Sequence, residues 1–225
     1  MTIPAPTALL AAAAFASAAS AQIATFTFSD LDGSFDQPSS TFTAQAGTST
    51  SGDVTRLMNA LSGPPGSAQF DTGFAALTTL ADVQIDLAVA SATATSATGN
   101  GSLTITDHTG DTLTADISGN FSILGPAIAF DGALTNVFFN DLTSDGQFDG
   151  PSTGSFSSNF APFLEPYEGT IIQLTFNPGA FFAQSFNNIP VLASGLIVPD
   201  PLLPPAPGGA LAILGAGLIA ARRRR

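Results

Sequence analysis

Aspartates and glycines gather between residues 140 and 150, in the order Asn140-Asp141-Leu142-Thr143-Ser144-Asp145-Gly146-Gln147-Phe148-Asp149-Gly150. Oxygen ligands in a loop bent by glycine are what calcium requires. The spacing departs from the EF-hand loop, because the third alternate position lacks an oxygen side chain and no glutamate closes the loop. If the chain binds calcium, we expect Asp141, Asp145 and Asp149 to be ligands. The alternative is that these residues make turns between strands, where Asp and Gly are common.

A second acidic cluster, Asp30-Leu31-Asp32-Gly33 with Asp36, allows the same two interpretations. His108 is the only histidine of the chain and lies between Asp107 and Asp111 in a predicted loop. A histidine-based zinc site or a Ser-His-Asp triad would both need it, and the sequence has no Gly-x-Ser-x-Gly motif. We therefore expect a solvated loop histidine and no enzymatic activity of the usual hydrolase kinds.

A glycosidase stays open as an alternative, because it needs only two carboxyl groups at a suitable separation. The only glutamates, Glu165 and Glu168, flank Pro166-Tyr167 in a predicted turn. The chain has no tryptophan and one tyrosine, so rings on which sugars stack are scarce. The 19 phenylalanines are better interpreted as core. For Arg56 we expect a structural ion pair rather than an anionic ligand.

Short runs with a two-residue alternation of apolar side chains predict the strands that would carry these loops. Two of them, 103–106 and 112–117, flank the loop 107–111 and predict a β-hairpin. The other predicted strands are 24–29, 82–90, 121–124, 134–139, 169–176 and 191–198, and predicted turns include Gly99-Asn100-Gly101, Gly119-Asn120 and Asp145-Gly146. Many short strands at this spacing predict an all-β fold, an antiparallel β-sandwich or jelly-roll-like domain.

One short helix is expected at residues 53–61, because Leu57, Met58 and Leu61 share a face and Gly63-Pro64-Pro65 would end it. The chain otherwise lacks helix formers for its surface, since it has no lysine and only two glutamates. The segment 91–101 is small and polar, and is either a continuation of a strand or a surface loop.

Composition excludes several classes of function. The chain has 17 acidic residues against five arginines, and four of these are the last four residues. Such a body repels phosphate backbones, so we expect no nucleic acid as a partner. The absence of cysteine excludes disulfides, thiolate metal sites and cysteine nucleophiles.

The N-terminal segment has the pattern of a secretory signal peptide, predicted to cover residues 1–21. An apolar run over residues 9–16 is followed by Ala19-Ser20-Ala21. Small residues at Ala19 and Ala21 are typical of a signal-peptidase cleavage site, which makes Gln22 the expected first residue of the exported protein. The run is too short to span a bilayer. The segment departs from the usual signal-peptide pattern in one respect, because no lysine or arginine precedes the apolar run.

The C-terminal segment, 198–225, combines three features. Its proline motifs are Pro199-Asp200-Pro201 and Pro205-Ala206-Pro207, its apolar stretch is 208–221, and its final residues are Arg222, Arg223, Arg224 and Arg225. A helix of 14 residues would be about 21 Å long, short of the ~30 Å hydrocarbon core. The arginines would stay on the cytoplasmic side of the membrane. A transiently membrane-anchored precursor is therefore expected; the alternative is an ordinary C-terminal membrane anchor.

A proline motif, a short apolar helix and a terminal arginine cluster together resemble the PEP-CTERM sorting signal. The usual Pro-Glu-Pro is absent: Pro199-Asp200-Pro201 keeps the acid, and Pro205-Ala206-Pro207 keeps the closer spacing to the helix. The resemblance implies an exosortase-like membrane protease as a partner, which cuts near the motif and transfers or releases the protein. It covers only about the last 25 residues and implies nothing about the domain between residues 22 and 197.

These observations lead to three hypotheses. The first is an exported surface or extracellular-matrix protein of structural or adhesive type, which has no cofactor and uses the secretion machinery, signal peptidase and an exosortase. Extracellular polysaccharide is a further partner to consider. The second is a calcium-dependent extracellular binding module. The third is a secreted carbohydrate-active enzyme on a β-sandwich.

Overall fold

A computed structural model describes residues 23–57, 65–77, 79–159, 166–179 and 181–198. The described chain is almost entirely β. Its strands are β1 (Ala24–Asp36), β2 (Thr41–Gln45), β3 (Ser51–Arg56), β4 (Gly66–Phe70), β5 (Asp82–Ala90), β6 (Ser96–Thr106), β7 (Thr112–Leu124), β8 (Ala127–Asn140), β9 (Gln147–Asp149), β10 (Ser155–Ser157), β11 (Tyr167–Phe176) and β12 (Phe186–Val198). A single 3-10 turn, η1 (Phe74–Ala76), is the helical element of the described residues.

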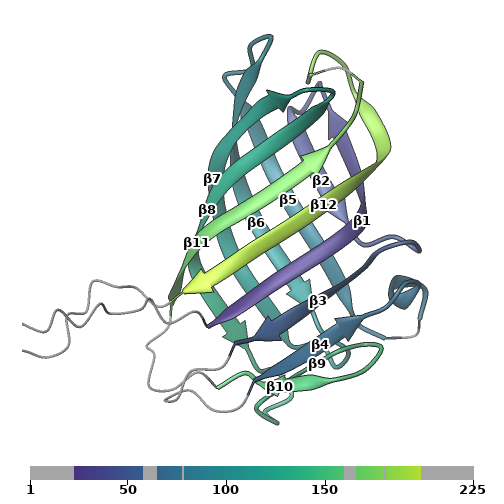
Figure 1. Cartoon of the computed structure of the whole chain (residues 1–225), viewed down its shortest axis with the longest axis vertical. Helices are drawn as coiled ribbons and strands as arrows, with labels where there is room; N and C mark the ends of the chain where they lie inside the picture. The colour runs from purple at the N-terminus through teal and green to yellow at the C-terminus, as the bar shows by residue number, and fades with distance from the viewer. Residues whose placement is uncertain (1–22, 58–64, 78, 160–165, 180, 199–225) are drawn as a thin grey trace, which may run out of the picture.

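Eight antiparallel strands close into a barrel (Figure 1). The neighbours around the wall are β1, β2, β5, β6, β7, β8, β11 and β12. The first and last strands then pair with each other, with Ala24 opposite Ile197 and Phe28 opposite Ala193. Closure leaves these strands without free edges, which is how all-β proteins avoid edge-to-edge association.

The all-β antiparallel prediction is confirmed, but the sandwich or jelly-roll arrangement is not what the structure has. Inward and outward side chains alternate in the same way in a sandwich and in a barrel. The two differ in whether the terminal strands meet. Here the β1–β12 pairing joins residues near opposite ends of the described chain. Local sequence patterns do not predict a contact over such a separation.

Strand β1 is shared between the barrel and a small extension. Its second half pairs with β2, whereas its first half, 24–29, pairs with β3. Strand β3 continues the pairing to β4, and the hairpin of β9 and β10 lies beside β4 (Figure 1). The edge of β4 is covered there, because Gln69 N donates to Thr153 O at 2.9 Å.

Phenylalanine rings fill the barrel interior. An eight-stranded barrel is just wide enough for side chains to occupy its inside. Phe42, Phe121 and Phe130 have no exposed surface. The centroids of the Phe121 and Phe130 rings are 4.6 Å apart, and those of Phe42 and Phe176 are 4.8 Å apart. The prediction that phenylalanines form the core is confirmed.

Two predicted turns proved to be strand interiors. Gly99 lies within β6 and Gly119 within β7. A Cβ on Gly99 would lie 2.7 Å from the Phe121 ring, and one on Gly119 would lie 2.7 Å from the Phe130 ring. These glycines leave room for the core rings, which is a packing role rather than a turn role.

The predicted helix at 53–61 is wrong over the part that the structure describes. Residues 53–56 belong to β3, with Val54 and Arg56 buried. Pairing with β1 on one side and β4 on the other overrides the helical spacing. The other predicted strands lie within observed strands, and β5 has the expected bounds. Residues 112–117 and 121–124, predicted as two strands, are parts of the single strand β7. Of the open segment 91–101, residues 96–101 belong to β6.

The two ends of the barrel differ in composition. We call the end with connections 107–111 and 141–146 and the β9–β10 hairpin the acidic end. Both described chain ends, Ile23 and Val198, lie there, since β1 starts opposite the last residues of β12. The connections 37–40, 91–95, 125–126 and 177–185 form the opposite end, which we call the apolar end.

Both predicted targeting segments lie outside the described residues. This applies to the signal-peptide site at Ala19 and Ala21, to both proline motifs and to the terminal arginines. Among the described residues, no helix is long and apolar enough to cross a membrane.

Candidate functional site

Asp107 organises the acidic end. Its side chain is fully buried in the β6–β7 hairpin loop. Oδ1 accepts hydrogen bonds from the backbone N–H groups of Thr109, Gly110 and Asp111 at 2.7, 2.8 and 2.9 Å. Oδ2 accepts from Asp149 N at 2.7 Å. One carboxylate therefore shapes the hairpin loop and attaches β9 to it, and its bonds replace the water lost on burial.

Asp111 joins a second loop to the same hairpin. Its side chain is 1% exposed. Oδ1 accepts from Thr143 N at 3.0 Å, and Oδ2 accepts from the Thr143 hydroxyl at 3.1 Å. These bonds bring the connection 141–146 against the hairpin loop.

Within that connection, Asp141 stabilises a tight turn. It accepts from Asp145 N at 3.1 Å and from Gly146 N at 2.8 Å. Ser144 and Gly146 have φ values of 60° and 72°, the left-handed conformation that such a turn requires. Asp145 in turn accepts from Gln147 N at 2.8 Å, so the turn leads directly into β9.

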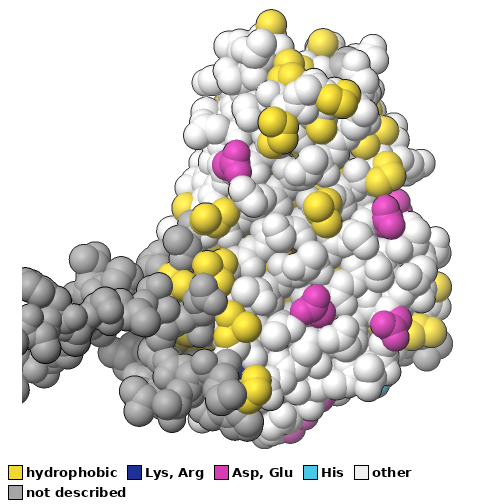
Figure 2. All heavy atoms as spheres, viewed as in Figure 1, with side chains coloured by type: hydrophobic (Ala, Val, Ile, Leu, Met, Phe, Trp, Pro, Cys, Tyr) yellow, Lys and Arg dark blue, Asp and Glu magenta, His cyan; other side chains and the backbone are white. Residues whose placement is uncertain are grey.

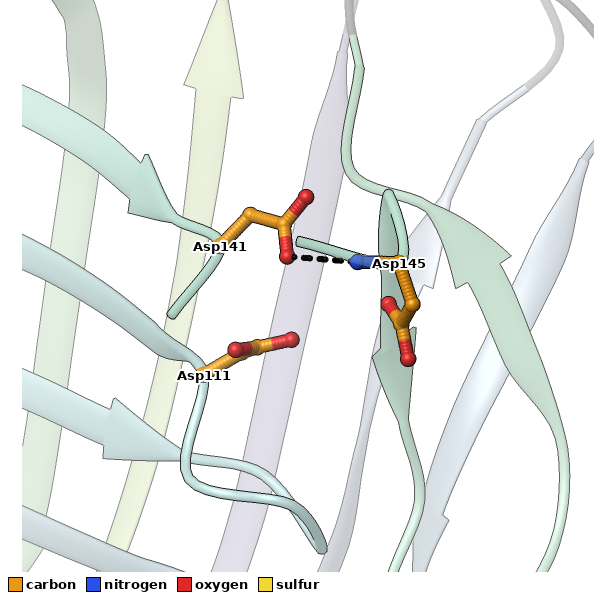
Figure 3. A group of neighbouring side chains, drawn as sticks. All are labelled: Asp111, Asp141 and Asp145. Atoms are coloured by element: carbon orange, nitrogen blue, oxygen red, sulfur yellow. Dashed lines mark hydrogen bonds between the residues drawn. The ribbon is translucent and has the colours of Figure 1, made fainter. Parts of the chain in front are cut away.

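The side chains of Asp111, Asp141 and Asp145 converge (Figure 3). One carboxylate oxygen from each lies within 4.8 Å of the others. Calcium binds oxygen ligands at about 2.3–2.6 Å, so two oxygens on one ion are up to about 5 Å apart. The separation of the three carboxylates fits a cation of this kind. Burial runs from Asp111, which is buried, to Asp145, which is exposed.

Asp149 lies beside this group but is not one of the three convergent residues. Burial raises its pKa, and the carboxylates of Asp107, Asp145 and Asp111 raise it further, while His108 lowers it. Of the three ligands predicted from sequence, the structure thus brings together Asp141 and Asp145, with Asp111 as the third. The signal for Asp111 was the Asp-His-Thr-Gly-Asp hairpin loop, whose contact with 141–146 depends on the fold.

His108 is exposed in the hairpin loop, as predicted, and its backbone N–H donates to Asp149 O at 2.9 Å. The second acidic cluster is not a loop, because Asp30 and Asp32 lie within β1. Asp30 has a φ of 55° at a β-bulge. Asp36 ends β1 and accepts from the Ser39 hydroxyl at 2.6 Å, which is a turn role.

Arg56 is the only lysine or arginine among the described residues, and it is 1% exposed. It extends from β3 and donates to the carbonyl oxygens of Ser157 and Asn159. Burial lowers its pKa, partly offset by Tyr167. Arg56 therefore attaches the segment after β10 to the barrel.

Three surface hollows are lined entirely by described residues. One lies at the apolar end beside Pro126 and Phe181. The other two lie on the outer wall, on either side of Ile171 and Gln173. Asp131 is the only carboxylate that lines any of the three. These hollows give no support to the glycosidase hypothesis, which needs two carboxyl groups across a cleft.

The fold and the site together define a closed antiparallel β-barrel with an aromatic core and a group of aspartates at one end. Comparison with protein-family models, with curated proteins and with solved structures finds no match to this chain. Its function therefore has to be argued from its own residues.

Proposed function

We propose that this chain is an exported, non-catalytic protein of the bacterial cell surface or extracellular matrix, of structural or adhesive type. The observation that carries the proposal is the filled barrel. Its interior holds phenylalanine side chains in contact with one another, so the fold supplies a rigid body rather than an enclosed ligand chamber.

The targeting segments predicted at the two ends of the sequence supply the rest of the argument. The signal-like segment ending at Ala21 and the tail resembling a PEP-CTERM signal both predict export. Ile23 and Val198 lie at the same end of the barrel. A precursor held by either terminal segment would therefore present the acidic end to the membrane and the apolar end away from it.

Intact mass and terminal peptide mapping test the proposal, on protein from the membrane and extracellular fractions of its own host. We expect a species that starts at Gln22 and ends between Pro199 and Gly209. Replacing both prolines of Pro199-Asp200-Pro201 by alanine, with the same change in Pro205-Ala206-Pro207 as its matched control, identifies the motif that is cut. Membrane-bound protein with Arg225 intact would contradict processing and leave the tail as a permanent anchor.

A second candidate is a calcium-dependent extracellular binding module. It is favoured by the convergence of Asp111, Asp141 and Asp145 within 4.8 Å. Three carboxylates at this separation repel one another, and a divalent cation relieves that repulsion. Calcium would thereby fix the hairpin loop, the 141–146 connection and β9 in one arrangement.

The thermal midpoint measured with and without calcium tests this candidate. At 100 times the dissociation constant a ligand adds about 2.7 kcal/mol to the unfolding free energy, which raises Tm of a domain this size by about 5–10 °C. Asp145→Asn should abolish the shift and raise Tm in the absence of calcium, because it removes repulsion. Asp116→Asn, which removes an exposed charge from the wall at β7, should keep the calcium shift. Equal midpoints with calcium, magnesium and chelator would refute calcium binding.

A further inference from the structure

We draw no further inference here: the strongest candidate, the two adjoining hollows on either side of Ile171 and Gln173 on the outer wall of the barrel, carries none, because hydrophobic and polar side chains are scattered over that face (Figure 2) and nothing in the structure shows what covers it.

Discussion

Packed aromatic rings occur at both ends of the barrel, since the Phe148 and Phe156 rings of the β9–β10 hairpin have centroids 5.4 Å apart, but among the described residues the buried carboxylates lie at the acidic end. At the acidic end, buried carboxylates accept backbone hydrogen bonds and join separate loops, as Asp107 does for the hairpin loop and β9. At the apolar end, aromatic rings pack against one another. Phe182 lies 4.7 Å from Phe35 and 4.8 Å from Phe121 between ring centroids.

The difference has consequences for how each end responds to its surroundings. Carboxylate hydrogen bonds and the repulsion between aspartates depend on pH, salt and cations. Ring packing depends on buried area and shape and is insensitive to those conditions. We therefore expect the stability of the acidic end to change more with pH, salt and cations than the stability of the apolar end, and variants at each end can test this difference.

The largest change in the free energy of unfolding is expected from Phe121→Ala, near the apolar end. Phe121 is fully buried, and its ring centroid lies 4.6 Å from that of Phe130 and 5.8 Å from that of Phe42. The lost burial and the cavity should lower the unfolding free energy by about 3–5 kcal/mol. Urea unfolding followed by circular dichroism measures it, at neutral and at mildly acidic pH. Ile123→Ala, on the same strand but 45% exposed, is the control and should cost far less.

Because the neighbours of the Phe121 ring are uncharged, the loss should be the same at both pH values. A loss that changed with pH would break the distinction between the two ends.

A smaller loss, about 2–3 kcal/mol, is expected from Asp107→Asn at the acidic end. The amide keeps an acceptor toward Gly110 N and Asp111 N, but its NH₂ group then faces Asp149 N–H, which leaves a donor without an acceptor. Asp36→Asn is the matched control at the other end of the barrel. Asp36 is exposed and accepts only from Ser39, so its replacement should change stability by less than about 0.5 kcal/mol.

Equal losses in the two variants would show that burial of Asp107 does not distinguish it from a surface turn residue. The measurement is again urea unfolding, with the slope compared between variants so that a change in the unfolded state is detected.

The sequence predicts the local parts of this fold well. Strand β5 and the hairpin around 107–111 follow from alternation and turn residues, because neighbouring positions alone decide them. Closure of the barrel cannot be predicted from such local patterns, because it requires Ala24 to pair with Ile197, which is distant in the sequence. Gly99 looks like a turn residue in the sequence, and only its contact with the Phe121 ring reveals a packing role.

The residues of the candidate site were likewise predicted only in part from the sequence. Asp141 and Asp145 are close in sequence and were predicted as ligands together with Asp149, which is not one of the three convergent residues. Asp111 is 30 residues away from Asp141, and it enters the group because Thr143 binds its carboxylate. Asp107 gives no sequence signal of its own beyond the hairpin pattern, although it makes more hydrogen bonds than its neighbours in the acidic end. Residues that assemble a site from several loops are visible only once the strands are paired.

The smallest expected effect is a pH-dependent change in stability caused by Asp149. Burial and the carboxylates of Asp107, Asp145 and Asp111 hold its pKa above the ordinary value of 3.8. The folded protein therefore binds the proton at pH values where the unfolded chain has lost it. The stability contributed by this group is fully present below 3.8 and is lost as pH rises through the raised pKa. Asp149→Asn removes the cost, so the variant should be more stable than wild type at neutral pH.

That advantage should shrink as pH falls toward 3.8, where the wild-type carboxyl is protonated as well. Thermal midpoints across this range measure it. Asp82, whose pKa burial also raises, is present in both proteins and cancels. Asp116→Asn removes one charge away from the acidic end and is the control. If Asp149→Asn gave the same increment as Asp116→Asn at every pH, the aspartates of the acidic end would not act on one another, and the expected response of that end to pH and ions would have to be abandoned.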